Sequence, residues 1–334
     1  MKSSERWDRL MKSCSIKGMG YAIPQRRVTN EELSTFVDTN HEWIVSRTGI
    51  ESRYVSEEEN TSDLGARAAR MALERSKVDP SEVDLIVCAT FTPDQTTPST
   101  ACLIQYKLGM NEQPVMAFDV NAACSGFLYA LQVAQSMIAA GSAHTALVIG
   151  AEVISKQLDW EDRNTCIIFG DGAGAMVLKQ EDTTKRILHF ARSKGDYEGI
   201  IHCDAPKPRP LFAPLGNTQD CVHMQGSATF RFAVKAMQES MEDVLRQAGV
   251  SIEDIDWIIP HQANMRIISN VCKRMNIDMK HVYINIHEYG NTSAASIPLA
   301  LGEMSERGLL REGMKIVLSG FGAGFTWAGA YIEL

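Results

Sequence analysis

The feature that most constrains this chain is an internal repeat with an offset of about 170 residues. Residues 78–86 are echoed by residues 250–258, an offset of 172 (250 − 78), and each copy follows an amphipathic helical stretch. Residues 121–131 and 291–301 form a second pair, at an offset of 170. Chance also produces one such echo between generic helix–strand units, but two in the same order indicate duplicated halves. We therefore expect the strand-to-helix junctions at Cys124 and Asn291 to face a shared central site.

Short apolar runs alternate with amphipathic helical stretches along both halves. Residues 64–76 have apolar positions at helical spacing, and Asp79-Pro80 ends this stretch before a short buried strand. The strands that we expect cover residues 83–89, 114–120, 146–150, 175–178, 255–259, 281–286 and 315–319. Alternation of this kind is typical of an α/β fold.

The charge balance and the cysteine pattern exclude several classes of protein. Lys and Arg number 33 against 41 Asp and Glu, a net charge of −8, so we expect no nucleic-acid partner and no anionic membrane partner. No apolar run approaches the ~18 residues of a membrane span, and residues 1–14 carry charges where a signal peptide needs an apolar segment. The eight cysteines are scattered without a CxxC pair, which does not suggest a disulfide framework. We expect a cytoplasmic protein.

One group of residues has metal-ligating side chains, namely His202, Cys203, Cys221 and His223. The first two are sequence neighbours that point to opposite faces of an extended chain, and the spacing of the two cysteines fits no standard zinc site. Plain loop residues are the favoured interpretation, and we expect no metal. The glycine-rich segments 170–174 and 320–324 fit neither GxGxxG nor a Walker loop, and they indicate tight turns or backbone N–H donors.

Three side chains at loop ends can carry chemistry. Cys124 lies between an apolar strand and a helix that reaches about residue 140, and the positive end of a helix dipole lowers a thiol pKa. His261 directly follows a strand, and Asn291 lies at another strand-to-helix junction. Together they supply a nucleophile, a base or hydrogen-bond donor, and a neutral amide donor. Taken singly, each also fits a structural role, as a core cysteine, a core histidine and a turn or N-cap asparagine.

Four motifs resemble those of the β-ketoacyl-acyl-carrier-protein synthase III family of the thiolase superfamily. They are AACSGF at 122–127, PHQAN at 260–264, GNTSAAS at 290–296 and FGAGFTW at 321–327, with further similarity at 42–50 and 169–174. The resemblance runs from about residue 15 to residue 334. It implies a thiolase-like α/β fold, with duplicated βα halves in αβαβα layers. The cysteine half would cover 15–182, the histidine and asparagine half would cover 183–334, and residues 1–14 would be an extension.

The family implies an acyltransferase that starts fatty acid synthesis by decarboxylative Claisen condensation. Cys124 would take the acyl group of an acyl-CoA primer as a thioester, with the N–H groups of Cys124 and Ala323 as oxyanion hole. His261 and Asn291 would bind the thioester carbonyl of malonyl-acyl-carrier-protein and stabilise the enolate left by carbon dioxide. The carbanion would attack the acyl-Cys124 thioester to give a 3-ketoacyl product. Phe321 would separate the two half-reactions.

The family also implies a CoA site and a homodimer. The adenine would stack on Trp43 and Arg163, with Arg47 near the phosphates, because planar groups stack well and Arg is always charged. Surface packing is the alternative role for these side chains. No cofactor is expected, since acyl-CoA is a substrate.

The carrier protein in such systems is acidic, so a local basic patch is needed. Arg266, Lys273 and Arg274 recur at i, i+7 and i+8 and share one helix face. Arg231 and Lys235 form another basic pair at i, i+4. A solvated charged face is the alternative explanation.

One position departs from the family pattern. Enteric-type members carry Phe before the Pro-Ser segment that lines the primer pocket across the dimer interface, and this chain has Thr97 there. The smaller side chain leaves room for a longer or branched primer, so we expect activity on branched or medium-chain acyl-CoA besides acetyl-CoA. Ala323 replaces the Gly of many members, which is tolerable if only its N–H is used.

Other functions are weaker matches to the residues. A related Cys-His-Asn ketosynthase that makes a specialised polyketide or ketoacyl product is the nearest alternative, although chalcone-synthase-like enzymes are typically longer. Thiolases need a second C-terminal cysteine, and none follows Cys272. Elongating condensing enzymes use His where Asn291 stands. Papain-like hydrolases share the Cys, His, Asn order, but not the context of Cys124. The presence of Cys124, His261 and Asn291 together argues against a non-catalytic acyl-CoA-binding protein.

Overall fold

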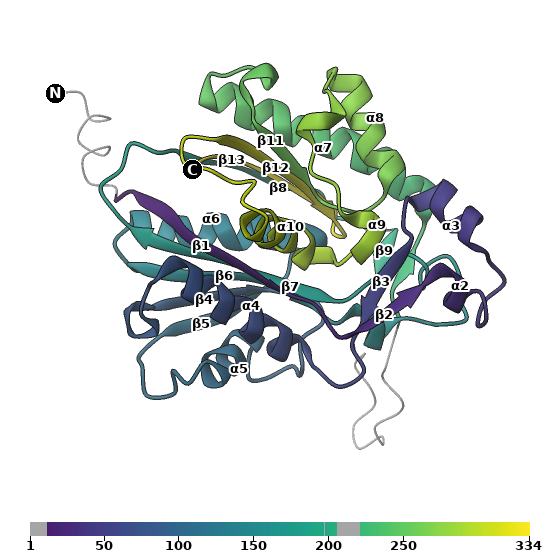
Figure 1. Ribbon diagram of the computed structural model, residues 1–334, viewed down its shortest axis with the longest axis horizontal. Coiled ribbons are helices and arrows are strands. Elements are labelled where there is room, and N and C mark those ends of the chain that lie inside the picture. The colour runs from purple at the N-terminus through teal and green to yellow at the C-terminus, as the bar shows by residue number, and fades with distance from the viewer. Residues whose placement is uncertain (1–11, 197, 206–220) are drawn as a thin grey trace.

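The computed structural model describes residues 12–196, 198–205 and 221–334. The N-terminal half forms a mixed five-stranded sheet in the order β1-β7-β6-β4-β5 (Figure 1). Its strands are β1 (Cys14–Ala22), β4 (Leu85–Ala89), β5 (Met116–Val120), β6 (Thr145–Glu152) and β7 (Gly172–Gln180). Strand β4 pairs in parallel with β5 and β6, while β7 runs antiparallel to β6 and β1. Most of the expected N-terminal extension lies outside the described residues.

The C-terminal half forms a second sheet in the order β11-β12-β13-β8. Its strands are β8 (Ile187–Ser193), β11 (Trp257–Pro260), β12 (Lys315–Gly322) and β13 (Thr326–Glu333). Strands β11 and β12 are parallel, and β13 runs antiparallel to both β12 and β8. The division that we expect between residues 182 and 183 falls in the connection between β7 and β8.

Helices form three layers around the two sheets (Figure 1). Helices α6 (Gly126–Ala139) and α10 (Ser296–Glu306) lie between the sheets. The outer face of the first sheet is covered by α4 (Thr61–Ser76) and α5 (Thr100–Lys107), and that of the second by α7 (Gly226–Ala248) and α8 (Met265–Met275). This is the αβαβα arrangement expected from the sequence.

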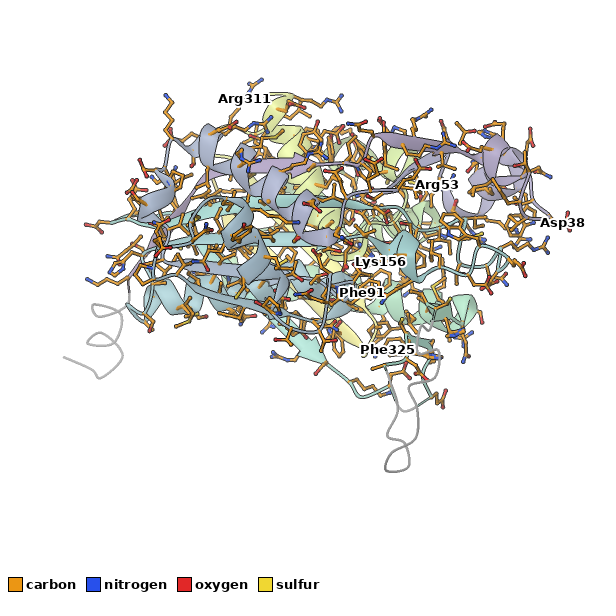
Figure 2. All side chains as sticks on the ribbon, turned by 90° about the horizontal axis from the view of Figure 1, so that it is seen from below. Asp38, Arg53, Phe91, Lys156, Arg311 and Phe325 are labelled. Atoms are coloured by element: carbon orange, nitrogen blue, oxygen red, sulfur yellow. The ribbon has the colours of Figure 1, made fainter. Side chains whose placement is uncertain are left out.

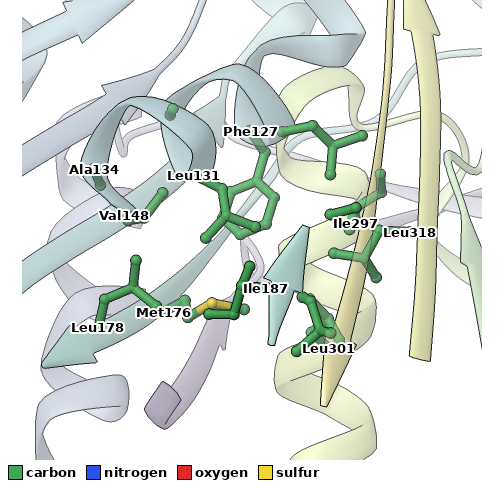
Figure 3. Packing of buried hydrophobic residues seen from close by; sticks show 14 of the residues in the cluster. Phe127, Leu131, Ala134, Val148, Met176, Leu178, Ile187, Ile297, Leu301 and Leu318 are labelled. Carbon is green, nitrogen blue, oxygen red and sulfur yellow. The ribbon is translucent and has the colours of Figure 1, made fainter. Parts of the chain in front are cut away.

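The central helix layer forms the main core (Figure 3). Phe127 and Leu131 of α6 meet Ile297 and Leu301 of α10, and apolar strand residues of both sheets surround them. All four side chains are at most 2% exposed, and burying each contributes about 1.5–3 kcal/mol. The two halves therefore share one core and are held as one unit.

Two glycines let α10 approach the first sheet closely. A Cβ on Gly150 would lie 2.2 Å from the carbonyl oxygen of Ala294, and a Cβ on Gly174 would lie 2.2 Å from the carbonyl carbon of Pro298. Real Cβ atoms do not approach other atoms this closely, so a side chain at either position would push α10 away. This contact fixes the segment that follows Asn291.

The internal repeat is visible in the backbone. The 3-10 turns η1 (Pro80–Glu82) and η4 (Ile252–Asp254) both carry capping boxes and precede β4 and β11, in register with the offset of 172. The turns η2 (Ala123–Ser125) and η6 (Ser293–Ala295) precede α6 and α10, in register with the offset of 170. The strand-to-helix junctions of the two halves therefore have the same construction.

The strand expected at 281–286 does not form. The 3-10 turn η5 (Met279–His281) leads into a single bridge between Ile258 and Val282, and the short helix α9 (Ile286–Tyr289) follows. The side-chain oxygen of Gln262 accepts the backbone N–H groups of Asn285 and Ile286, which turns the chain away from the sheet edge.

Smaller elements border the site. The hairpin β2 (Arg26–Thr29) and β3 (Ser52–Val55) encloses α2 (Asn30–Leu33) and α3 (His41–Thr48), and β9 (Ile201–His202) pairs with β10 (His223–Met224). The turn η3 (Ile154–Gln157) follows β6.

Candidate active site

One cavity of about 1080 Å³ contains the three side chains singled out in the sequence. Cys124 reaches it from η2, His261 from the position directly after β11, and Asn291 from two residues before the turn η6. The structure therefore brings the junctions of both halves to one place, as the repeat predicts.

The turn that carries Cys124 is held from the opposite half. The Oγ1 of Thr326 donates to the carbonyl oxygen of Ala122 at 2.9 Å and lies 3.1 Å from the carbonyl oxygen of Ala323. A Cβ on Gly322 would lie only 2.7 Å from the backbone nitrogen of Cys124. The end of β12 thus packs directly against the turn that carries Cys124, and Ala323 lines the same cavity.

The prediction of a lowered thiol pKa for Cys124 is wrong. Burial raises the pKa of the Cys124 thiol to about 12, and the opposing effects of the Ser293 side chain and the Cys124 N–H do not offset it. The regular helix α6 begins only at Gly126, beyond a 3-10 turn, so the thiol is not at its first position. Desolvation therefore exceeds the influence of the helix N-terminus.

His261 is a buried, neutral imidazole with both ring nitrogens available. Its backbone N–H donates to the carbonyl oxygen of Ser319 at 2.7 Å, which ties it to β12. Neither ring nitrogen has a hydrogen-bond partner, and burial lowers the pKa of His261 to about 3. The ring of Phe321 packs edge-on against it, with centroids 5.5 Å apart. An uncharged imidazole can donate one N–H to a ligand at neutral pH.

The amide of Asn291 has a defined orientation. Its backbone N–H donates to the carbonyl oxygen of Ile168 at 2.9 Å, and its backbone carbonyl accepts the N–H of Gly170 at 3.1 Å. Its side-chain oxygen accepts the backbone N–H of Ser293 at 2.8 Å. This leaves the NH₂ group as the donor for a ligand in the cavity.

Phe321 belongs to an aromatic cluster beside the cavity. The ring of Phe232 lies edge-on to Phe321 with centroids 6.3 Å apart, and it stacks on Phe325 at 4.0 Å. Phe321 is 3% exposed and lines the cavity near both His261 and Ala323. It is therefore a packed wall of the site.

The CoA-binding side chains expected from the sequence lie together on α3 and in the loop after η3. The guanidinium carbons of Arg47 and Arg163 lie 4.5 Å and 5.3 Å from the centre of the Trp43 ring. Arg163 also donates to the carbonyl oxygen of Asp38 at 2.7 Å. A base between Trp43 and Arg163 needs two contacts of roughly 3.5–4.0 Å each, so Arg163 has to move to admit it.

The expected basic residues fall into two groups. Arg231 and Arg266 line the cavity, as does Arg47. Lys273 and Arg274 are exposed farther along α8 and do not line it. Asn264 connects α8 to α3, because its side chain accepts the N–H of Arg266 and donates to the carbonyl oxygen of Arg47.

Thr97 is exposed and is not among the lining residues of the cavity in the single chain. Its neighbour Thr96 and the preceding Phe91 and Pro93 do line it. A role for Thr97 in primer selection therefore needs a second copy of the chain to carry it into a site.

The histidines of the metal-like cluster contact each other. The rings of His202 and His223 stack with centroids 4.9 Å apart where β9 pairs with β10. Within residues 12–196, 198–205 and 221–334, no group of three or more His, Cys, Asp or Glu side chains is arranged to hold a metal ion. The proline-rich segment between Cys203 and Cys221 lies outside the described residues. None of the described helices is long and apolar enough to cross a membrane.

Sequence reasoning missed two residues that hold the site together. Thr326 joins Ala122 to Ala323, and Gln262 fixes the His261 loop by donating to the carbonyl oxygens of Pro260 and Tyr283. Both lie inside motifs that carry the resemblance, but only their three-dimensional contacts reveal these roles.

Comparison with known proteins gives one answer. The family model described as 3-oxoacyl-[acyl-carrier-protein (ACP)] synthase III matches residues 118–195, and the model of the C-terminal part of that enzyme matches residues 245–334. Beta-ketoacyl-[acyl-carrier-protein] synthase III of Clostridium acetobutylicum is 47% identical, over 97% of this chain and 99% of the relative.

Solved structures agree in fold. The 3-oxoacyl-[acyl-carrier-protein] synthase III of Aquifex aeolicus superposes with a TM-score of 0.89 at 41% identity, covering 96% of this chain and 100% of that one. The priming beta-ketosynthase of the R1128 polyketide pathway has a TM-score of 0.90 at 34% identity, with 97% of each chain covered. The chain belongs to the β-ketoacyl-acyl-carrier-protein synthase III family.

Proposed function

We propose that this protein joins an acyl-CoA primer to malonyl-acyl-carrier-protein with loss of carbon dioxide, through an acyl-Cys124 thioester. The reaction is that of a β-ketoacyl-acyl-carrier-protein synthase III, an acyltransferase that initiates fatty acid synthesis. The observation that carries the residue assignment is that Cys124, His261 and Asn291 line one cavity.

In the first half-reaction the Cys124 sulfur attacks the carbonyl carbon of the acyl-CoA thioester. The new S–C bond forms as the CoA sulfur departs, and the proton of the Cys124 thiol ends on the CoA thiol. The N–H groups of Cys124 and Ala323 stabilise the oxyanion, since Gly322 brings these two backbone segments into contact. A thiol with a raised pKa reacts only when its proton leaves, and the neutral imidazole of His261, which lines the same cavity, would accept that proton.

In the second half-reaction the malonyl thioester carbonyl accepts hydrogen bonds from His261 and Asn291. The bond between the malonyl methylene and its carboxylate breaks, carbon dioxide leaves, and the electron pair enters the enolate. Both donors are uncharged, so they stabilise the negative oxygen of the enolate without neutralising the malonyl carboxylate beforehand. The carbanion then forms the C–C bond to the acyl group, and Cys124 is released as a thiolate that takes a proton.

Two groups of side chains would bind the two substrates, acyl-CoA and malonyl-acyl-carrier-protein. Trp43, Arg47 and Arg163 would bind the CoA nucleotide, with Arg163 moving off Trp43 to admit the adenine. Arg231, Arg266, Lys273 and Arg274 would form the surface for the acidic carrier protein. The cytoplasmic location expected from the sequence is part of this proposal.

A homodimer is also part of the proposal. Strand β5 is the outer strand of its sheet and its Met116 is 53% exposed, while Tyr106 of the adjacent helix α5 is 68% exposed. An edge strand with exposed apolar side chains offers its open side for pairing, and a twofold axis would join two β5 strands antiparallel. Met116→Lys should shift the protein toward monomer in sedimentation equilibrium. A monomeric wild type, or an unchanged dimer in the variant, would contradict this interface.

The central experiment follows the acyl group. The enzyme is incubated with labelled acyl-CoA, the labelled residue is identified by mass spectrometry, and malonyl-acyl-carrier-protein is then added. We expect label on Cys124 and its transfer to a 3-ketoacyl product. Label on another residue, or condensation by Cys124→Ala, would overturn the assignment. Decarboxylation of malonyl-acyl-carrier-protein by Cys124→Ala would support the roles of His261 and Asn291.

A further inference from the structure

Arg53 on β3, labelled in Figure 2, is a buried cation, and no ion pair with a carboxylate is found for it among the described residues. It is 0% exposed. Its Nη1 donates to the side-chain oxygen of Asn30 at 2.9 Å, and its Nη2 donates to the carbonyl oxygen of Ile167 at 2.7 Å. Its Nε is buried with no partner. Burying a charge without an opposite charge beside it lowers the stability of the folded state. An apolar side chain at this position would therefore serve a purely structural role at a lower free-energy cost.

The hydrogen bond to Ile167 reaches the segment that holds Asn291. Residue 168 accepts the backbone N–H of Asn291, and Gly170 donates to the Asn291 carbonyl. Phe169 and Asn291 form the parallel bridge between these two segments. The guanidinium of Arg53 therefore fixes one side of the bridge on which the Asn291 backbone rests.

The stem of Arg53 lies against the same bridge. A Cβ placed on Gly290 would lie 3.4 Å from the Cβ of Arg53, and one placed on Gly170 would lie 3.1 Å from it. Gly290 and Gly170 are the neighbours of Asn291 and Phe169 in the two segments. The Cβ of Arg53 thus lies beside both glycines, and its guanidinium is hydrogen-bonded to the Ile167 segment.

We propose that Arg53 is a positioning residue for Asn291, and through it for the malonyl half-reaction. The proposal rests on the proposed role of Asn291 as donor to the malonyl thioester. Cys124 is held by different contacts, from Gly322 and Thr326, which Arg53 does not touch. Loss of the planar guanidinium of Arg53 should therefore impair decarboxylation and condensation, while acylation of Cys124 at saturating acyl-CoA persists.

The test compares the two half-reactions in Arg53→Met and Arg53→Lys. Acylation is followed as the single-turnover labelling of Cys124 by acyl-CoA, and decarboxylation as carbon dioxide release from malonyl-acyl-carrier-protein. Misplacing a donor by about 1 Å costs up to about 100-fold in rate, so we expect a loss of at least about tenfold in decarboxylation for Arg53→Met. Arg53→Lys keeps the charge but lacks the planar guanidinium, and its decarboxylation rate should lie between those of wild type and Arg53→Met. Acylation should stay within about twofold of wild type.

Leu33→Ala is the matched control for lost stability. Leu33 is 2% exposed and belongs to the same apolar cluster as Val28 and Ile167, but its apolar side chain cannot donate a hydrogen bond to Ile167 as Arg53 does. It should lower the melting temperature and leave the ratio of the two half-reactions unchanged. Equal losses in both half-reactions for the Arg53 variants, or the same split in Leu33→Ala, would overturn the proposal. If Arg53→Met does not fold, wild-type decarboxylation by Arg53→Lys overturns it.

Asn291→Ala separates this proposal from the one on which it rests. If Asn291→Ala retains decarboxylation, the role of Asn291 fails, and the role of Arg53 fails with it. If Asn291→Ala loses decarboxylation and both Arg53 variants retain it, only the role of Arg53 fails.

Discussion

Asn121 and Asn291 hold the same backbone turn in the two halves of the molecule. The side-chain oxygen of Asn121 accepts the N–H of Ala123 at 3.2 Å, and that of Asn291 accepts the N–H of Ser293 at 2.8 Å. Ala123 and Ser293 have φ values of 47° and 49°, in the left-handed region that few non-glycine residues adopt. One duplicated turn therefore presents a thiol in the first half and an amide NH₂ group in the second.

The close packing of Gly322 on the nucleophile turn predicts the effect of a single methyl group. Gly322→Ala would place its Cβ 2.7 Å from the Cys124 nitrogen, so the two N–H groups proposed as the oxyanion hole must separate. Loss of one such donor costs about 100- to 1000-fold in rate, and we expect acylation of Cys124 to fall by about that factor. Single-turnover labelling with acyl-CoA measures it.

Gly320→Ala is the matched control for this substitution. It lies two residues earlier in β12, and its Cβ would meet only side-chain atoms at 3.4 Å or more. Acylation by Gly320→Ala should stay close to wild type. Equal losses in the two variants would show that β12 tolerates no side chain there and that the Cys124 nitrogen is not the sensitive contact.

The raised pKa of Cys124 predicts how its alkylation depends on pH. Because burial raises this pKa to about 12, the thiolate is a small fraction at neutral pH. The rate of alkylation by iodoacetamide should therefore rise about tenfold per pH unit between pH 7 and pH 9, without a plateau. Cys124→Ala provides the background from the other cysteines. A plateau below pH 9 would mean that the thiol is already ionised.

The sequence predicted an α/β fold and the meeting of Cys124, His261 and Asn291 at one cavity because both depend on short-range patterns, whereas the αβαβα layers came from the family resemblance. The repeat of a turn before a helix specifies where Cys124 and Asn291 stand, and the apolar runs predicted the strands of the two main sheets except β1, β8 and β13. Two expectations failed where long-range contacts decide the outcome. Desolvation by surrounding residues governs the thiol pKa of Cys124, and the side chain of Gln262 turns residues 281–286 away from the sheet. No sequence pattern reports either contact.

The proposed carrier-protein surface predicts a selective effect of charge reversal. Arg266→Glu should raise the KM for malonyl-acyl-carrier-protein by about tenfold at low salt, since interface charges of this kind set the association rate. Acylation by acyl-CoA should change little. Lys280→Glu is a matched control, because its exposed ammonium is paired with Asp278 and does not line the cavity. A tenfold rise of this KM in both variants would mean that net charge alone sets it, and would contradict a carrier-protein surface at Arg266.

The primer prediction concerns Thr97. If a second copy of the chain carries this side chain into the primer pocket, Thr97→Phe fills the space that a branched primer needs. The kcat/KM for isobutyryl-CoA should then fall by about tenfold or more while that for acetyl-CoA is retained. Measured wild-type values that strongly favour acetyl-CoA over isobutyryl-CoA and isovaleryl-CoA would contradict the prediction before any variant is made.

His189 should contribute to acid sensitivity. Its ring nitrogens are buried without partners, and burial lowers its pKa to about 4. The unfolded chain binds the proton near pH 6.5 and the folded chain does not, so stability is lost as pH falls from 6.5 toward 4. His189→Leu should therefore reduce the stability lost between pH 7.5 and pH 5.0 by about 2 kcal/mol in urea unfolding. The exposed His287→Leu is the control, and an equal loss in wild type and His189→Leu would contradict this role.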